Sequence, residues 1–232
     1  MAVPSSKLTP SGRPGPRLED IPNMYASTAD GKPKLEPNGE INNYILHQFP
    51  DGYRGYAIDV GASDGVLVNS TFVLEHYHCW RVLSVEANPY MKDLLNQFRL
   101  FVKMCAVGSK PADGVDFHIN MDNVEALSAL EPKRHHPRFI HEDKGRWMTV
   151  KINVRTLDQL LEESEFPRLD ALCVDVEGGE ADVLASMDWK KWTPRVVVVE
   201  TWDRGEHDPF LIPKGYERVW RSAENDVYLR AL

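Results

Sequence analysis

Short apolar runs alternate with amphipathic segments along most of the chain. Alternating or continuous apolar runs predict β-strands, and apolar residues three and four positions apart predict helices. Strands are expected at 56–60, 81–85, 100–106, 115–119, 148–154, 170–175, 195–200, 215–220 and 226–230. Helices are expected at 41–49, 66–77, 89–98, from Thr156 onward and at 180–187. This order predicts an α/β fold with a mostly parallel sheet, and the last two strands predict a hairpin that adds an antiparallel edge.

The first 38 residues differ in composition from the rest of the chain. They hold seven of the sixteen prolines, with serine and glycine between them. Such a segment predicts a mobile arm, although it could instead fold over an active site as a lid. Residues 39–232 are expected to form one domain, with 121–147 as an insertion and candidate substrate loop.

Composition narrows the class of protein. The 232 residues are 42% hydrophobic and 27% charged, as in an ordinary soluble globular protein. The net charge of −8 and pI of about 5.5 argue against broad, phosphate-driven binding of nucleic acid. No apolar stretch reaches 18 residues and no apolar N-terminal leader is present, so we expect no membrane span and a cytoplasmic protein.

The most informative stretch is Asp59–Gly65, which directly follows an expected strand. The next strand ends in Glu86, and a glycine turn followed by a strand-end acid is typical of nucleoside binding in α/β proteins. The spacing Gly61-x-x-x-Gly65 differs from the G-x-G-x-x-G that binds a pyrophosphate. Asp59 and Asp64 would repel phosphates but suit the ammonium of S-adenosylmethionine (SAM). The alternative is a tight turn that binds no ligand.

Acidic residues stand at the carboxyl ends of four expected strands. They are Asp59, Glu86, Asp175 with Glu177, and Glu200. Ligands of open α/β sheets bind outside these strand ends. A single strand-end acid is often a helix cap, whereas four in register predict a binding site.

Three segments together resemble the FkbM family of SAM-dependent methyltransferases. They are the glycine-loop segment 55–90, the segment 154–160, and 170–184 with its Asp-Val-Glu-Gly-Gly-Glu sequence. The resemblance covers roughly residues 40–230. It implies a Rossmann-like class I methyltransferase fold, with a seven-stranded sheet and helices on both faces. It also implies O-methylation of a hydroxyl on a sugar, polyketide or similar metabolite.

The motifs and the resemblance give an expected set of cofactor-binding residues. Glu86 would hold the ribose hydroxyls of SAM, and the small Ala87 would let adenine lie flat. The full set is Asp59, Gly61, Ala62, Ser63, Asp64, Gly65, Asn69, Ser70, Glu86, Ala87, Ala106 and Asp175.

Catalysis on an alcohol requires that its proton be removed by a general base or with the help of a metal. Asp175, Glu177 and Glu200 are the expected catalytic residues, and the three could also hold one Mg²⁺. The alternative is that Asp175 binds the amino acid end of the cofactor and Glu177 caps the following helix. Glu180 is expected to be a first-turn acid that faces the helix dipole.

The acceptor itself is not specified by the sequence. A small molecule or a glycan is favoured, whereas N-methylation of a peptide or nucleic acid and a non-catalytic SAM-binding module are the alternatives. The insertion carries His135, His136 and His141, any of which could act as a base, although a solvated loop is the safer interpretation. Trp202 and His207 are candidate pocket walls. The sequence gives no basis for an oligomeric state.

Overall fold

A computed structural model describes residues 39–66, 69–121, 128–130, 146–222 and 224–231. The expected arm at 1–38 lies outside these residues. So does most of the 121–147 insertion, with His135, His136 and His141.

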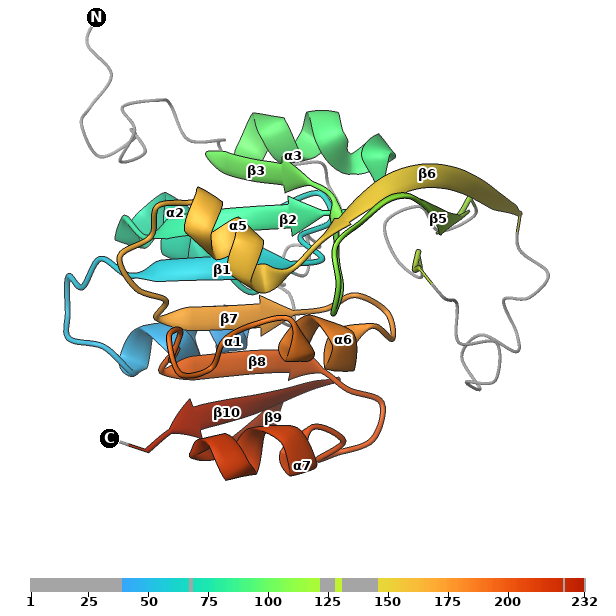
Figure 1. Cartoon of the computed structure of the whole chain (residues 1–232). Helices are drawn as coiled ribbons and strands as arrows, with labels where there is room; N and C mark the ends of the chain where they lie inside the picture. The colour runs from blue at the N-terminus through green and yellow to red at the C-terminus, as the bar shows by residue number, and fades with distance from the viewer. Residues whose placement is uncertain (1–38, 67–68, 122–127, 131–145, 223, 232) are drawn as a thin grey trace, which may run out of the picture.

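The described residues form helices and strands in the expected alternation (Figure 1). The helices are α1 (Gly39–His47), α2 (Phe72–His78), α3 (Lys92–Phe98), α5 (Leu157–Glu163), α6 (Glu180–Ala185) and α7 (Asp208–Leu211), with 3-10 turns η2 (Pro89–Met91) and η3 (Ile212–Lys214). The strands are β1 (Tyr56–Val60), β2 (Arg81–Glu86), β3 (Phe101–Met104), β4 (Ala106–Val107), β5 (Ala112–Asn120), β6 (Trp147–Arg155), β7 (Ala171–Val174), β8 (Val196–Glu200), β9 (Tyr216–Ser222) and β10 (Asn225–Arg230).

Seven strands form the main sheet, in the order β3-β2-β1-β7-β8-β10-β9. The pairs from β3 to β8 are all parallel, and β10 is antiparallel to both β8 and β9. The predicted α/β fold, with a mostly parallel seven-stranded sheet and an antiparallel C-terminal hairpin, is therefore confirmed. Parallel strands end on one side, which places Val60, Val174 and Glu200 along the same edge (Figure 1).

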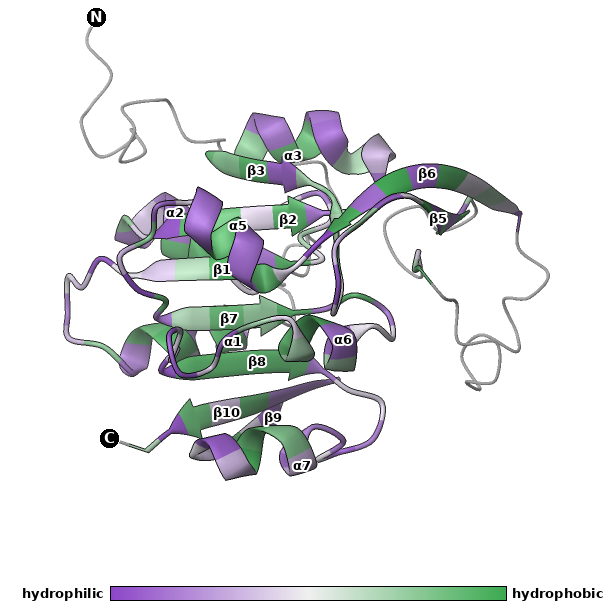
Figure 2. Cartoon of the chain, in the orientation of Figure 1, coloured by the Kyte–Doolittle hydropathy of each residue, from purple (hydrophilic) through white to green (hydrophobic). Residues whose placement is uncertain are grey.

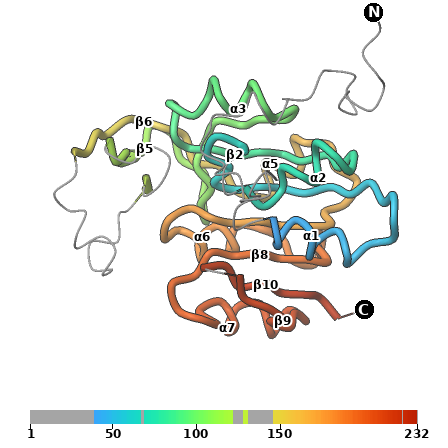
Figure 3. The backbone as a smooth tube through the Cα atoms, turned by 180° about the vertical axis from the view of Figure 1, so that it is seen from behind, coloured from blue at the N-terminus to red at the C-terminus, as the bar shows by residue number. Residues whose placement is uncertain are grey.

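Helices cover both faces of the sheet because neighbouring strand residues point to opposite sides. Ile58 and Val60 pack in one core cluster, with leucines of α5, α6 and α7. Ala57 packs in the other, with Ile41 and Ile45 of α1. The view from behind shows α1 and α2 on the face opposite α5 (Figure 3). Strands β7 and β8 are apolar along most of their length, as expected for strands buried on both faces (Figure 2).

Two expected elements differ from those observed. The helix expected at 66–77 begins only at Phe72, because the Asn69 side chain accepts hydrogen bonds from the backbone N–H groups of Thr71 (2.9 Å) and Phe72 (2.8 Å). The strand expected at 100–106 divides into β3 and β4, because β4 leaves the main sheet to pair with β6.

Strands β4, β6 and β5 form a second, three-stranded sheet. The long strands β5 and β6 are antiparallel along most of their length, and only the two-residue β4 joins them to the chain leaving β3. Strands β5 and β6 form a ribbon, called the β5–β6 ribbon below, that projects beyond the carboxyl ends of the main strands, as both views show (Figures 1 and 3).

The loop after β1 is held by the buried side chain of Arg99, which directly follows α3. Arg99 Nε donates to Glu75 Oε2 (2.5 Å), and Nη2 donates to Thr71 Oγ1 (2.8 Å). Nη1 donates to the carbonyl oxygen of Gly65 (3.0 Å) and to Asn69 Oδ1 (2.9 Å). The side chain of Arg99 is 0% exposed, and its guanidinium thus joins the loop after β1 to helix α2 through hydrogen bonds inside the domain.

Asp59 completes this network from the end of β1. Its Oδ2 accepts hydrogen bonds from Thr71 Oγ1 (2.6 Å) and Asn69 Nδ2 (2.8 Å), and lies 3.8 Å from Arg99 Nη1. Burial raises the pKa of Glu75, and the nearby Arg99 opposes that shift. Both carboxyl groups therefore depend on Arg99 for electrostatic compensation inside the domain.

No helix among the described residues is long and apolar enough to cross a bilayer. The three cysteines are free, with Cys105 and Cys173 buried and Cys79 partly exposed.

We expect Arg99→Lys to destabilise the protein. Lysine keeps the charge but cannot donate to Glu75, Gly65 and Thr71 together, so buried acceptors lose their donors at a cost of about 1–3 kcal/mol. Denaturant unfolding followed by circular dichroism measures this loss. The control is Arg155→Lys, whose ion pair with the exposed Asp113 should contribute ~1 kcal/mol or less. Equal stability of the two variants would contradict the role given to Arg99.

Candidate active site

The candidate site lies at the carboxyl ends of β1, β2, β7 and β8. Backbone hydrogen bonds tie these ends together: Gly61 N–H donates to the carbonyl of Val85 (3.0 Å), and Asp175 N–H donates to that of Val60 (2.9 Å). The glycine loop, the end of β2 and the segment after β7 are thus parts of one structure.

The two loop glycines are required by close packing. Gly61 has φ +86° and Gly65 has φ +82°, a region that favours glycine. A Cβ at position 61 would lie 1.6 Å from the carbonyl oxygen of Asp175, and one at position 65 would lie 2.7 Å from Cγ of Arg99. The loop can therefore pass this close to β7 and Arg99 only if both positions are glycine.

Glu86 occupies the position expected of a ribose-binding acid. It ends β2 and is 8% exposed. Its Oε2 accepts from the backbone N–H of Ser63 (2.8 Å), and Oε1 accepts from that of Asn88 (2.7 Å). Burial raises its pKa, while these backbone hydrogen bonds oppose the shift. The backbone N–H of Ala87 also acts on this carboxylate, and a carboxylate has about four acceptor positions, so one remains for a ligand hydroxyl.

Several other expected cofactor residues are buried and form hydrogen bonds within the glycine loop. Asp59 and Asn69 hydrogen-bond to each other, and Asn69 Nδ2 also lies 3.3 Å from the carbonyl oxygen of Ala62. Asp64 Oδ1 accepts from the backbone N–H of Val66 (2.8 Å). These three side chains shape the loop, and direct contact between them and a cofactor stays a prediction.

The remaining expected cofactor residues lie around the same edge. Ala62 and Ser70 are buried in the loop, and Ser63 holds the left-handed backbone conformation with φ +51°. Ala87 is half-buried directly after Glu86, whereas Ala106 is buried at the start of β4.

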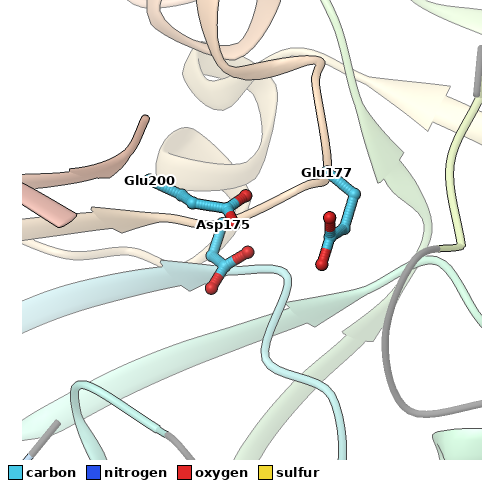
Figure 4. A group of neighbouring side chains, drawn as sticks. All are labelled: Asp175, Glu177 and Glu200. Carbon is cyan, nitrogen blue, oxygen red and sulfur yellow. The ribbon is translucent and has the colours of Figure 1, made fainter. Parts of the chain in front are cut away.

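Asp175, Glu177 and Glu200 form a carboxylate cluster, and this name is used below for these three residues. One oxygen of each lies within 4.8 Å of the others. Figure 4 shows Asp175 and Glu177 projecting from the segment after β7, and Glu200 reaching the same place from the end of β8. The structure thus brings together all three residues that the sequence marked as catalytic.

The cluster is electrostatically unfavourable as it stands. Burial raises the pKa of Asp175, and the negative charge of Glu177 raises it further. Burial also raises the pKa of Glu200, with Asp175 as the next cause. Such crowding of acids is typical of a site that binds a positive group or moves a proton.

The segment after β7 is held by Glu180. Glu180 Oε1 accepts from the backbone N–H groups of Val176 (3.2 Å) and Gly178 (2.8 Å). Helix α6 begins after Gly179, and Glu180 stands in its first turn as expected, whereas a capping role of Glu177 stays a prediction. Glu177 itself has a left-handed backbone, with φ +57°.

Two further residues bear on the site. Arg99 carries no motif signal in the sequence, because a lone arginine after a helix usually faces solvent. His207, a candidate pocket wall, is buried, and its Nε2 lies 3.4 Å from the backbone oxygen of Glu200.

Comparison with known proteins agrees with this geometry. Residues 59–217 match the family model described as a methyltransferase FkbM domain. The chain is 26% identical over 199 residues to methyltransferase sdnD of Sordaria araneosa, covering 73% of this chain and 76% of that protein.

Solved methyltransferases are similar at lower identity. The FkbM methyltransferase of Methylobacillus flagellatus is 14% identical with a TM-score of 0.48, over 76% of this chain and 43% of that one. The precorrin-6y C5,15-methyltransferase of Geobacter metallireducens is 11% identical with a TM-score of 0.43, over 90% and 96%. The chain thus spans less than half the length of the solved FkbM protein.

The family match covers well over half of the sequence, from the end of β1 to the start of β9. It includes the glycine loop, Glu86 and the whole carboxylate cluster. The resemblance seen in the sequence motifs is confirmed, and the chain belongs to the FkbM methyltransferase family.

Proposed function

We propose that the protein transfers the methyl group of SAM to a hydroxyl oxygen of a small metabolite or glycan. The observation that carries this proposal is the position of the carboxylate cluster beside the glycine loop. The carbonyl oxygen of Asp175 would touch a Cβ at Gly61, so the cofactor loop and the cluster are direct neighbours. Proton-accepting groups would therefore lie next to the donor.

The donor site has the chemistry that SAM requires. Glu86 offers the remaining acceptor position of its carboxylate for a ribose hydroxyl, and Ala87 leaves room beside it for the adenine ring. The acids of the cluster suit the positive charges of SAM. When bound, SAM supplies a methyl group that its sulfonium has already activated.

The protein's part in the reaction is to hold the acceptor oxygen in line with that methyl group and to accept its proton. Asp175 or Glu177 takes the proton of the acceptor hydroxyl. The oxygen–carbon bond forms as the carbon–sulfur bond breaks, and the electron pair of that bond stays on sulfur. The sulfonium becomes a neutral thioether, so charge and atoms balance.

We expect Glu86→Ala to weaken the binding of S-adenosylhomocysteine strongly, because the ribose loses its acceptor and the loop loses the bond to Ser63. Isothermal titration calorimetry gives the affinity, with NAD as a negative control. If the affinity of the variant equals that of the wild type, the assignment of the ribose site is wrong.

Gly61→Ala should abolish the same binding, because its Cβ would collide with the backbone of Asp175. Gly215→Ala is the matched control: its φ of +88° is nearly the same, but nothing lies within 4 Å of the added Cβ. Both variants bear the cost of a left-handed alanine, so the difference between them reports the close approach alone. Calorimetry that found the two variants equally affected would contradict this explanation.

The double change Asp175→Asn with Glu177→Gln should lower the rate of methyl transfer by about 10²–10⁴, the usual range for loss of a general base. Both substitutions keep side-chain shape, so the affinity for S-adenosylhomocysteine should fall much less than the rate of methyl transfer. Single-turnover assays with panels of hydroxylated and amine acceptors measure the rate and the acceptor class. Normal turnover of the double variant would exclude the catalytic role, and transfer only to amines would replace O-methylation by N-methylation.

A further inference from the structure

We propose that the carboxylate cluster binds one divalent cation, with Mg²⁺ as the natural ion, and that this cation holds the acceptor oxygen. The role given to the acceptor rests on the proposed function, whereas the cation site itself rests on the geometry of the cluster alone.

The spacing of the cluster suits such an ion. One oxygen from each of Asp175, Glu177 and Glu200 lies within 4.8 Å of the other two. Oxygens on opposite sides of Mg²⁺ are about 4.2 Å apart, and on opposite sides of Ca²⁺ about 4.8 Å. The widest pair therefore exceeds the widest pair of a magnesium site by at most about 0.6 Å, and the other two pairs would lie about 3 Å apart around the ion.

Glu200 provides an independent sign that a positive ligand is needed. The residue is 5% exposed, and its Oε2 is buried with no hydrogen-bond partner in the described part of the chain. Buried carboxylate oxygens are normally paired or coordinate a metal, because leaving one without a partner is costly. Glu200 ends β8 and its carboxylate points toward Asp175, so the carboxyl group with this buried oxygen is the one that belongs to the cluster (Figure 4).

The charges of described residues that raise the pKa of Asp175 and of Glu200 all belong to other acids. Neither Asp175 nor Glu200 forms an ion pair with a lysine or arginine of the described residues. The other charged groups that act on both are Glu177 and Glu180, which are also acids. An ammonium of SAM supplies one positive charge, whereas a divalent cation supplies two and so favours the ionised form of several acids at once.

Three protein ligands leave room for an acceptor. Mg²⁺ prefers six oxygen ligands, so about three positions remain for water or for a substrate hydroxyl. Binding to the cation would orient that hydroxyl and make its proton easier to remove. The acceptor expected for such a site has a hydroxyl with a second oxygen close by, as in a vicinal diol.

The test is binding of Mn²⁺, used as a spectroscopic substitute for Mg²⁺, to the full chain without other ligands. Electron paramagnetic resonance counts the bound ions, and we expect one site. Glu200→Gln and Asp175→Asn should each lower the affinity by about tenfold or more, since even outer-shell changes cost that much. Glu162→Gln is the control, because Glu162 is exposed and pairs only with the surface residue Lys191.

Two results would overturn the proposal. One is an absence of stoichiometric Mn²⁺ binding, or binding that Glu200→Gln and Asp175→Asn leave unchanged. The other is displacement of Mn²⁺ by S-adenosylhomocysteine, which would assign the cluster to the amino acid end of the cofactor.

The outcomes also separate this proposal from the methyltransferase mechanism. If methyl transfer is undiminished in the presence of EDTA, the cation has no role in the reaction, and the proposed O-methylation still stands. Stoichiometric Mn²⁺ binding by a protein that does not bind S-adenosylhomocysteine would support the cation site and contradict the donor site.

Discussion

The glycine loop depends on the hydrogen bonds of one buried group, the guanidinium of Arg99. It joins the start of the loop at Asp59, its far end at Gly65, and helix α2 at Glu75. These segments come from different parts of the chain, and each brings polar groups into a region that excludes water. Arginine suits this place because its five N–H donors can satisfy several acceptors at once.

Comparison of the two groups of buried acids shows how the same residue type serves two purposes. Asp59 and Glu75 are compensated by Arg99, so they stabilise the domain. In the carboxylate cluster, burial and the negative charge of neighbouring acids raise the pKa of Asp175 and of Glu200. An acid that pairs with Arg99 is part of the structural framework. The acids of the carboxylate cluster would instead be stabilised by a positively charged ligand.

The sequence predicted the positions of most strands along the chain, because strands such as Val196–Glu200 are continuously apolar, and it predicted a mostly parallel sheet because strands alternate with helices. It also placed the carboxylate cluster, since strand-end acids must meet at one edge of a parallel sheet. It could not show that Asn69 delays the start of α2, or that Arg99 lies inside the domain. Both depend on side-chain hydrogen bonds between residues that no local pattern connects.

The β5–β6 ribbon could change in length without disturbing the rest of the fold. Its backbone hydrogen bonds are largely internal, and among the described residues β4 and a contact between Tyr90 Oη and Met148 Sδ (3.6 Å) connect it to the main body. A longer or shorter ribbon would leave the seven-stranded sheet and the glycine loop unchanged. Because the ribbon extends past the carboxyl ends of the main strands, a change in its length would reshape the surroundings of the candidate site without altering the sheet itself (Figure 1).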